Sequence, residues 1–417
     1  MREKIIQGLL VIMLIAGYRN LSAQSKDLDY YIGSGIQKSP LLNDLRNQSR
    51  STAIDSMRIN AGYKPQVMGI SNNSYAPSIN GWGYDNAITN GGTFSQLITV
   101  NKRLVGKENL QNQYEAIRLA KESLAISGKV TEQDIRKAIT SQYIVAYGIY
   151  LQYSFNKEVL ELLGSEEAIL KKLTERNIYR QTDYLSFLVT MQQQQLQLNQ
   201  LKVQFQNEFA SLNYLSGLQD TGFVAVPAPN ISLAPPPEIE QTVFYQQFRL
   251  DSLKLKNSDA QIDFSYKPKL SLYADAGHSS TFAVNPYKNF GTSFGINLSV
   301  PIYDGKQKKM QHDKIAIAQQ TRQQYQQFYK TQFDQQLLQL LQQLRSAQEL
   351  INQTSTQIRY TQALIEANRK LLETGDVRMS DYIIAIGNYL AARNSSTQNM
   401  IYKLQLINQI NYWNRKT

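Results

Sequence analysis

The spacing of hydrophobic residues along the chain alternates between two periods. Segments in which hydrophobic and polar residues alternate, rich in Gly, Asn, Ser and Thr, predict strands, and they lie at about 66–75, 92–104, 269–278 and 290–301. Segments with hydrophobic residues three and four positions apart predict helices, and they cover about 107–215 and 307–414. Each pair of strands therefore precedes one long helical segment.

Breaks in the helical segments divide each of them into a hairpin. Polar residues at 176–182 and at 374–376 indicate that the chain turns back at these points. Ser127-Gly128 predicts a further interruption in the first segment. Residues 27–60 are predicted to be helical or extended, and a helix at about 239–264 precedes the second pair of strands.

The two halves of the chain repeat the same landmarks at a separation of about two hundred residues, and self-similarity at a fixed distance indicates duplication. The landmarks are Tyr63-Lys64-Pro65 with Tyr266-Lys267-Pro268, Phe94 with Phe294, and Thr182-Asp183-Tyr184-Leu185 with Ser380-Asp381-Tyr382-Ile383. We expect a first repeat at 24–217, a proline-rich linker at 218–240 and a second repeat at 241–417.

Four strands are too few to form a closed barrel, because about eight is the smallest closed number. A sheet in lipid has to close, since an open edge leaves backbone groups without hydrogen-bond partners. Two chains would give a narrow barrel filled with side chains, and about twelve strands from three chains is the smallest number that leaves a pore. A helix of about 65 residues extends on the order of 100 Å, which suits a wall across the periplasm better than a compact domain.

The N-terminus has the features of an export signal. Arg2 and Lys4 precede an apolar stretch, Ile5 to Ala16, that is too short to cross a bilayer comfortably. Residues 1–23 are expected to be removed before Gln24; the alternative is a membrane anchor. No later segment is apolar over the roughly 18 residues that a transmembrane helix needs, so a membrane span would have to be a β-barrel.

Composition narrows the classes of function. The chain has 417 residues, with 44 Lys and Arg against 33 Asp and Glu and a net charge of +11, yet only 18% of residues are charged. No basic cluster stands out, which argues against nucleic-acid binding. The chain has no Cys and two His, His278 and His312, which excludes disulfides, thiolate metal sites and histidine-rich metal sites. No catalytic motif is present, so we expect neither an enzyme nor a cofactor.

Two motifs of the second half lie where a strand enters a helix and where a helix turns back. The first, Val300-Pro301-Ile302-Tyr303-Asp304-Gly305-Lys306, is similar to the proline–aromatic–Asp–Gly turn at which a strand enters its helix in TolC-like outer-membrane efflux proteins. Leu371 to Gly375, followed by Ser380-Asp381-Tyr382, resembles the family's glycine-containing helical tip. The resemblance covers almost the whole chain after the export signal, and it rests on order, spacing and duplication together.

The resemblance implies a mixed, mainly α fold. Long antiparallel helical hairpins would form an α-barrel, and the four strands would contribute to a trimeric twelve-stranded membrane β-barrel. The chain would be the exit duct, in the outer membrane and periplasm, of a tripartite efflux or type I secretion system. Its partners would be a periplasmic adaptor protein, an inner-membrane pump or ABC exporter, and outer-membrane lipid. The linker at 218–240 and the N-terminal segment would form an equatorial belt. Drugs, metals and secreted proteins are all cargo in that family, so the cargo class stays open.

The helical tips and the strand ends hold the candidate functional residues. Asp183 and Asp381 are interpreted as helix N-caps or as acids at a periplasmic aperture, where Asp381 of three chains would form a cation-selective ring. Arg180 and Arg378 would form inter-hairpin bridges that hold the aperture shut, or would be solvated charges. The following aromatic residues suit an interfacial girdle or ordinary barrel packing: Tyr75, Trp82, Tyr84, Phe282, Tyr287 and Phe290.

The first half departs from the family pattern. Val100 to Leu104 replaces the turn, and Asn177 stands where a tip glycine is expected. In the second half, Leu372 and Ile384 occupy positions at which family members carry Tyr or a second acid. Gating is therefore expected around Gly375 to Asp381. The alternatives to a duct are a structural or adhesive coiled-coil envelope protein, which would lack paired strands, and a monomeric porin, which would need many more strands.

Overall fold

The computed structural model describes residues 26–85, 87, 91–220, 222, 224–235, 238–281 and 288–414. The expected export signal, 1–23, and two aromatic candidates, Phe282 and Tyr287, lie outside these residues. In the ranges that the structure describes, no helix is both long and apolar enough to cross a bilayer.

The chain divides into two compact units, and each contains segments of both sequence repeats. The helical unit comprises residues up to 40, 131–237 and 333–416, and the sheet unit comprises 41–130 and 238–332. Two long helices, α5 (Lys107–Glu175) and α8 (Gln307–Thr374), contribute residues to both units.

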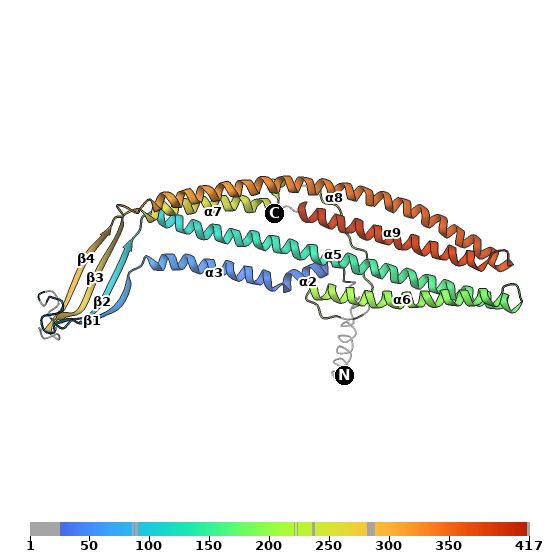
Figure 1. Cartoon of the computed structure of the whole chain (residues 1–417), viewed down its shortest axis with the longest axis horizontal. Coiled ribbons are helices and arrows are strands. Elements are labelled where there is room, and N and C mark those ends of the chain that lie inside the picture. Colours follow the sequence, from blue (N-terminus) through green and yellow to red (C-terminus); the bar gives the residue numbers. More distant parts are fainter. Residues whose placement is uncertain are drawn as a thin grey trace, which may run out of the picture. The chain divides into compact units, whose positions relative to one another are not determined.

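The sheet unit contains one antiparallel sheet with the strand order β1-β2-β3-β4 (Figure 1). The strands are β1 (Gln66–Tyr75), β2 (Gly92–Leu104), β3 (Lys269–Thr281) and β4 (Phe290–Ser299), at the positions where alternation predicts them. The central pair, β2 with β3, joins the two sequence repeats, so neither repeat forms a sheet by itself. Within the described residues β1 and β4 are edge strands.

The two faces of this sheet differ in polarity. Residues directly opposite each other on paired strands share a face, and one such row is Val67, Val100, Ala274 and Phe294. Since side chains alternate between faces, this apolar face also holds Ile98, Leu270, Leu272, Ile296 and Leu298. The opposite, polar face holds Asn101, Arg103, Ser271, Asp275, Ser293, Asn297 and Ser299, with fewer hydrophobic residues. Phe294 is 90% exposed, so the apolar face is open in a single chain.

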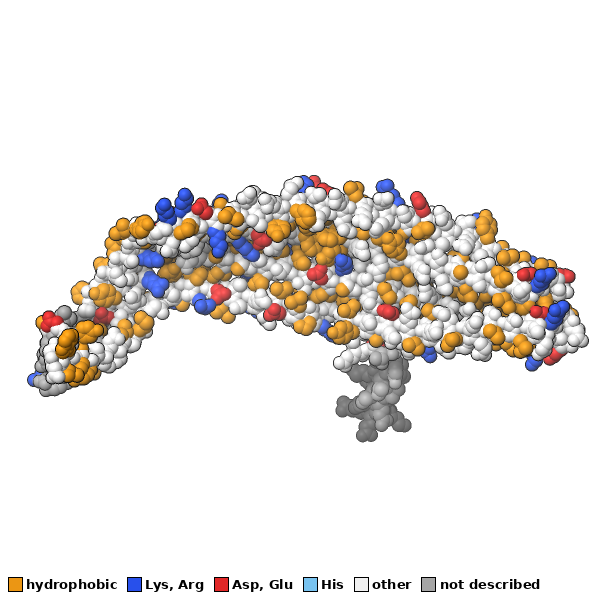
Figure 2. Space-filling view, in the orientation of Figure 1, with side chains coloured by type: hydrophobic (Ala, Val, Ile, Leu, Met, Phe, Trp, Pro, Cys, Tyr) orange, Lys and Arg blue, Asp and Glu red, His pale blue; other side chains and the backbone are white. Residues whose placement is uncertain are grey.

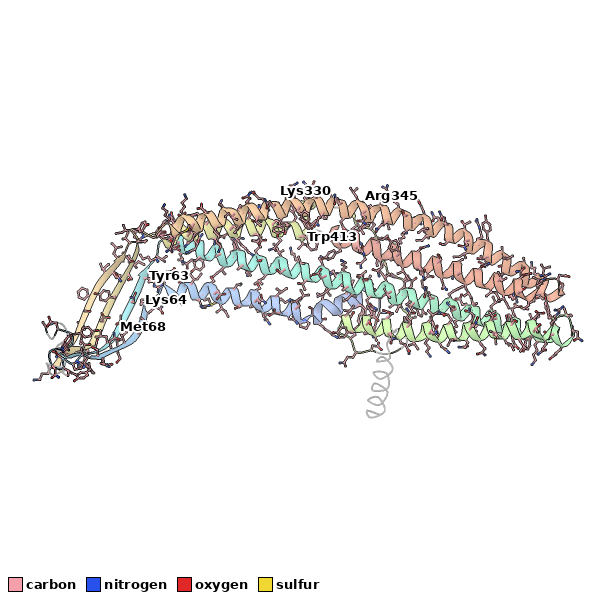
Figure 3. All side chains as sticks on the ribbon, in the orientation of Figure 1. Tyr63, Lys64, Met68, Lys330, Arg345 and Trp413 are labelled. Atoms are coloured by element: carbon pink, nitrogen blue, oxygen red, sulfur yellow. The ribbon has the colours of Figure 1, made fainter. Side chains whose placement is uncertain are left out.

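The repeated Tyr-Lys-Pro motif marks the point at which a helix passes into a strand. Helix α3 (Pro40–Gly62) ends just before Tyr63, and α7 (Val243–Ser265) ends just before Tyr266. The proline that follows disfavours helical geometry in the residue before it, and β1 and β3 begin directly after Pro65 and Pro268. Figure 3 shows Tyr63 and Lys64 at this junction of α3 and β1.

Helices of the sheet unit pack through a small core. Leu119 and Ile126 of α5 contact Val243 and Leu250 of α7. A short 3-10 helix, η1 (Ile239–Gln241), precedes α7, and the Thr242 hydroxyl caps that helix by accepting a hydrogen bond from the Tyr245 N–H.

The predicted interruption at Ser127-Gly128 is wrong, because α5 is one continuous helix of 69 residues. A glycine inside a helix costs about 1 kcal/mol relative to Ala. Burial of Ile126 and Val130 on either side of Gly128 offsets this cost. The N-terminal stretch, for which helix and extended chain were both open, is helical in α2 (Leu28–Lys38) and α3.

The helical unit is built from α2, α6 (Gln181–Leu215), α9 (Met379–Asn414) and parts of α5 and α8, which lie side by side in Figure 1. One core surrounds Phe187 and Tyr382 near the helix turns, and another surrounds Tyr31, Tyr143 and Phe205. Trp413 packs on a neighbouring helix, where its ring centroid lies 6.4 Å from that of Phe333 in α8.

The predicted linker region after α6 contains no helix or strand in its described residues before η1. Val226 is buried against the core of Tyr31 and Tyr143, whose hydroxyl donates to the Pro227 carbonyl at 2.9 Å. Asn411 of α9 holds the same segment by accepting from the Ala234 N–H at 2.8 Å. These contacts fix the linker along the helices of the helical unit.

Candidate functional site

The turn between α5 and α6 and the turn between α8 and α9 have the same backbone geometry. Asn177 has φ 59° and Gly375 has φ 81°, both in the left-handed region. The N–H of Asn177 donates to Thr174 O and that of Ile178 to Leu173 O. In the same pattern, the Gly375 N–H donates to Leu372 O and the Asp376 N–H donates to Leu371 O, so both helices end in a Schellman motif. Asn177 therefore replaces a tip glycine because Asn tolerates positive φ better than most residues.

The two turns contact each other in the helical unit. The Tyr179 hydroxyl donates a hydrogen bond to the Val377 carbonyl at 2.9 Å. A Cβ atom on Gly375 would lie 2.7 Å from Cγ2 of Ile178, so glycine permits a close approach as well as positive φ. Burial raises the pKa of Tyr179, with Asp183 and Asp376 as further causes.

Both candidate aspartates lie in the first turn of a returning helix, but they are not N-caps. Arg180 occupies the N-cap of α6, and the N–H groups of Asp183 and Tyr184 donate to its carbonyl. Arg378 has the same two bonds, from Asp381 and Tyr382. The aspartates therefore stand at the third helical position, where an acid is favoured by the helix dipole. Asp183 also accepts the Arg180 N–H at 3.2 Å.

The charged residues at these turns are largely open to solvent. Asp381, Arg180 and Arg378 are exposed, and Asp183 is half-buried. Neither arginine forms an ion pair within the part of this chain that the structure describes, so a bridge between hairpins would need another chain. Figure 2 shows Lys, Arg, Asp and Glu side chains gathered at the end of the helical unit that these turns form.

A buried carboxylate near the turns was not expected from the sequence. Glu166 of α5 has no exposed side-chain surface, and its Oε1 lies 2.8 Å from Nε of Arg369 in α8. Burial raises the pKa of Glu166, although Arg369 acts in the opposite direction. The signal was present: Leu163, Glu166 and Leu170 are spaced as one helix face, so an acid interrupts a hydrophobic stripe.

The strand-to-helix turn at Pro301 to Gly305 is organised by Asp304. Its Oδ2 accepts the Lys308 N–H at 2.6 Å and its Oδ1 accepts the Lys306 N–H at 2.8 Å. These backbone bonds, that from Lys308 first, lower the pKa of Asp304. Gly305 has φ 63°, which a glycine adopts without strain. Tyr303 is 83% exposed and has no structural role in the described contacts of one chain.

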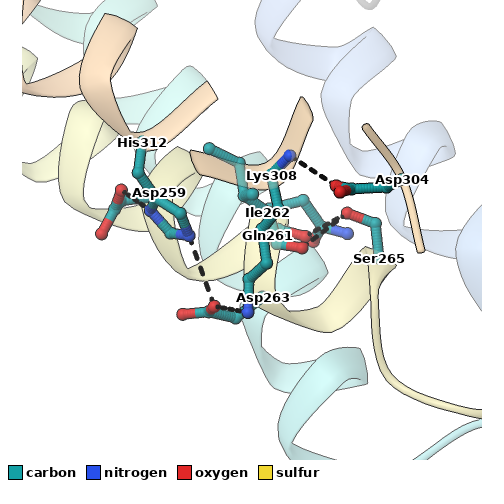
Figure 4. A network of polar contacts seen from close by, with 8 residues as sticks. All are labelled: Asp259, Gln261, Ile262, Asp263, Ser265, Asp304, Lys308 and His312. Carbon is teal, nitrogen blue, oxygen red and sulfur yellow. Dashed lines mark hydrogen bonds and ion pairs between the residues drawn. The ribbon is translucent and has the colours of Figure 1, made fainter. Parts of the chain in front are cut away.

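A polar network next to this turn joins α7 to α8 (Figure 4). Nδ1 of His312 lies 2.6 Å from Oδ1 of Asp259, and Lys308 Nζ lies 2.8 Å from Oδ1 of Asp263. The Asp259 hydrogen bond raises the pKa of His312, with Asp263 as a further cause. No group of the described His, Asp and Glu residues is arranged to hold a metal ion.

The described aromatic candidates lie at the ends of the strands away from the helices. Tyr75 is 77%, Trp82 85%, Tyr84 75% and Phe290 66% exposed. Phe290 packs edge-on against His278 at a centroid distance of 5.3 Å. Their exposure leaves these aromatic side chains available for contact with other molecules.

No protein-family model and no curated protein sequence matches the chain. Solved structures do match it. It aligns with CusC at 13% identity and a TM-score of 0.74, over 95% of this chain and 95% of CusC. It aligns with the outer membrane protein VceC of Vibrio cholerae at 12% identity and a TM-score of 0.72, over 93% of this chain and 96% of VceC.

The chain also aligns with the MtrE outer membrane channel of Neisseria gonorrhoeae, crystallised in its open state, at 12% identity and a TM-score of 0.70, over 93% of this chain and 88% of MtrE. These proteins are TolC-family channels. The chain therefore has the TolC-like fold, and the mixed, mainly α fold class is confirmed.

Proposed function

We propose that this chain is a passive exit duct of the outer membrane, with its helices in the periplasm. The observation that carries this proposal is the polarity of the sheet. Val67, Val100 and Phe294 stand on an apolar, exposed face, whereas Arg103 and Asn297 stand on the opposite one. A membrane barrel has this alternation, with hydrophobic side chains toward lipid and polar ones toward water.

The number of strands supports closure from several chains. Strands β1 and β4 are the open edges of an antiparallel sheet with four strands, so they run in opposite directions. The β4 edge of one chain therefore pairs antiparallel with the β1 edge of the next in a head-to-tail ring. Three chains give about twelve strands, enough for a pore. The assembly we propose is a homotrimer.

By likeness to the channels above, the duct works with a periplasmic adaptor and with an inner-membrane pump or ABC exporter. The long helices fit this arrangement, since α5 and α8 have 69 and 68 residues and are each on the order of 100 Å long. The two repeats, 24–217 and 241–417, would supply one hairpin each, and 218–240 would form an equatorial belt.

The opening that we propose for the periplasmic end is the pair of helix turns. Exposed Asp381 would line it in three copies, with Asp183 behind it, and Arg180 and Arg378 would bridge to neighbouring chains. Gly375 would set the shape of the turn. In the sheet unit, Tyr75, Trp82, Tyr84 and Phe290 would meet the membrane interface.

Cross-linking tests the assembly. The full chain, purified from membranes in mild detergent, is treated with an amine-reactive cross-linker and run on a gel with and without heating. We expect a ladder that ends at three chains and an unheated species that disappears on boiling. A monomer that stays in solution without detergent would contradict the duct and favour a structural coiled-coil protein.

A further inference from the structure

A cavity of about 1000 Å³ lies in the sheet unit where one end of the sheet meets the helices. The residues that line it come from β2, β3 and β4, from the first two turns of α5 and from the last residues of α7. The loops after β2 and α7 and Tyr63, which follows α3, complete the lining. Most of the strand residues that line the cavity are on the polar face, and Leu104 and Leu270 are on the apolar face. No residue of the helical unit takes part. None of the functional assignments above uses this cavity.

The charges that line the cavity are predominantly positive. Four cations, Arg103, Lys107, Lys267 and Lys269, stand against a single acid, Glu108. Lys267 Nζ lies 3.2 Å from Oε2 of Glu108, so the charge of Lys267 is matched by that of Glu108. The other three cations are exposed, and none of them forms an ion pair in the ranges that the structure describes. Figure 2 shows Lys and Arg side chains gathered over the helix ends beside the sheet.

The register of the sheet fixes the side to which two of these cations belong. Arg103 lies opposite Ser271, which lies opposite Asn297, and all three are on the polar face. Lys269 lies opposite Ser299 on the same face. The cations are therefore on the face away from the apolar one, toward water and away from lipid. Lys107 is the first residue of α5, whose dipole adds to the positive potential there.

The wall of the cavity is not only charged. Phe264 and Pro268 line it beside the cations, and Lys267 Nζ lies 4.5 Å from the centroid of the Phe264 ring. A cavity that has both an apolar wall and unmatched cations is complementary to a molecule that has an anionic group and an apolar part. A small inorganic anion would leave the apolar wall uncovered.

We propose that this cavity binds organic anions, that is, molecules with a carboxylate, sulfonate or phosphate group beside an apolar part. It would thereby favour anionic molecules among those that pass through the duct. The preference for anionic molecules in transport rests on the proposed function, whereas the binding of organic anions in the cavity does not. A lipid headgroup has the same chemistry, but the placement of Arg103 and Lys269 away from the apolar face favours a water-soluble anion.

Equilibrium dialysis with 1-naphthalenesulfonate tests the binding site on the detergent-solubilised full chain. We expect saturable binding that is lost in 1 M salt, where the Debye length falls to about 3 Å. The triple variant Arg103→Gln, Lys107→Gln, Lys269→Gln should bind about tenfold more weakly. The matched control, Lys309→Gln, Lys314→Gln, Lys330→Gln, removes three exposed charges of the same unit outside the cavity and should bind as the original chain does.

Several outcomes would overturn the proposal. They are equal binding by the triple variant, equal binding of 1-naphthylmethylammonium, and displacement of the probe by phosphatidylglycerol at equal concentration, which would identify a lipid site. Far-UV circular dichroism establishes that the variants fold. If the triple variant does not fold, Arg103→Gln and Lys269→Gln are measured singly, and each should weaken binding about threefold.

Planar-bilayer recordings test the consequence for transport. We expect 1-naphthalenesulfonate to block the current of the original chain and of the control variant, and to block the triple variant at about tenfold higher concentration only. Absence of any current would refute the proposed duct, while the dialysis result would still decide the binding site. Current with equal block in all three proteins would refute the preference for anionic molecules.

Discussion

The Glu166 carboxylate, which is fully shielded from solvent, is paired with the Arg369 guanidinium at 2.8 Å between Oε1 and Nε. This pair joins α5 to α8 close to the helix turns. Its surroundings are incompletely satisfied: Oε2 of Glu166 and the hydroxyl of Tyr382 are buried without a hydrogen-bond partner among the described atoms. Arg369 is therefore the group that compensates the buried charge of Glu166 at this end of the helical unit.

Replacement of that side chain should destabilise the helical unit. Arg369→Ala leaves a buried carboxylate without its partner, which costs roughly 3–5 kcal/mol for a fully buried pair. Because the Arg369 side chain is 48% exposed, water can enter after its removal and solvate part of the Glu166 charge. We expect a loss of about 2 kcal/mol in the free energy of unfolding, measured with urea. Arg359→Ala, an exposed position on the same helix, should change it by less than about 0.5 kcal/mol.

The same carboxylate should make stability depend on pH. Burial raises the pKa of Glu166, so the folded chain holds this proton more tightly than the unfolded chain does. The contribution to stability is complete below the ordinary pKa of about 4.5 and is lost as pH rises through the raised value. Glu166→Gln should remove this loss. The difference in unfolding midpoint between the two proteins, measured from pH 4 to pH 8, should grow in favour of the variant; a constant difference would contradict the raised pKa.

Alanine should destabilise both helix turns at their left-handed residues, whereas glycine should be tolerated at position 177. Gly375→Ala places a Cβ at positive φ and against Ile178, and we expect a loss of about 1–2 kcal/mol. Asn177→Gly should cause no loss, because glycine adopts positive φ readily. Asn177→Ala should cost about 1 kcal/mol. Urea unfolding of the three variants provides the comparison, and equal effects of Asn177→Gly and Asn177→Ala would show that φ is unimportant there.

Asp381 should determine how the duct interacts with multivalent cations. If three copies line the periplasmic opening, Asp381→Ala reduces block by di- and trivalent cations in planar-bilayer recordings. Asp313→Ala, an exposed acid of the sheet unit, should leave the block as it is. Unchanged block in Asp381→Ala would remove this residue from the opening.

Local sequence signals were sufficient for the strands and for both helix turns. The prolines at 65 and 268 mark the points at which a helix ends and a strand begins. The alternating hydrophobic residues from Phe294 to Leu298 all lie on the apolar face of the sheet. Signals that depend on packing were misread. Gly128 predicts a helix break because glycine has a low helix propensity, yet neighbouring buried residues keep the helix continuous. Asp183 and Asp381 were interpreted as N-caps because aspartate is a common N-cap residue and arginine is not, yet arginines occupy these positions.

Contacts between distant segments were beyond the sequence. Glu166 and Arg369 belong to different repeats, and only the packing of α5 on α8 reveals their pairing. The hydrogen bond from Tyr179 to Val377 and the basic cavity beside the sheet likewise bring together residues from both halves of the chain. Single side chains of ordinary type acquire their roles from partners about two hundred residues away.

Two adjacent residues of β4 test the central claim most directly. Ile296 is on the apolar face and Asn297 on the polar face. Because the chain has no cysteine, each is changed to Cys singly and labelled with the same fluorophore in the full chain in lipid vesicles. We predict quenching by a nitroxide in the lipid chains at Ile296→Cys and by iodide in water at Asn297→Cys. Equal quenching of both positions by iodide, with none from lipid, would contradict a membrane barrel.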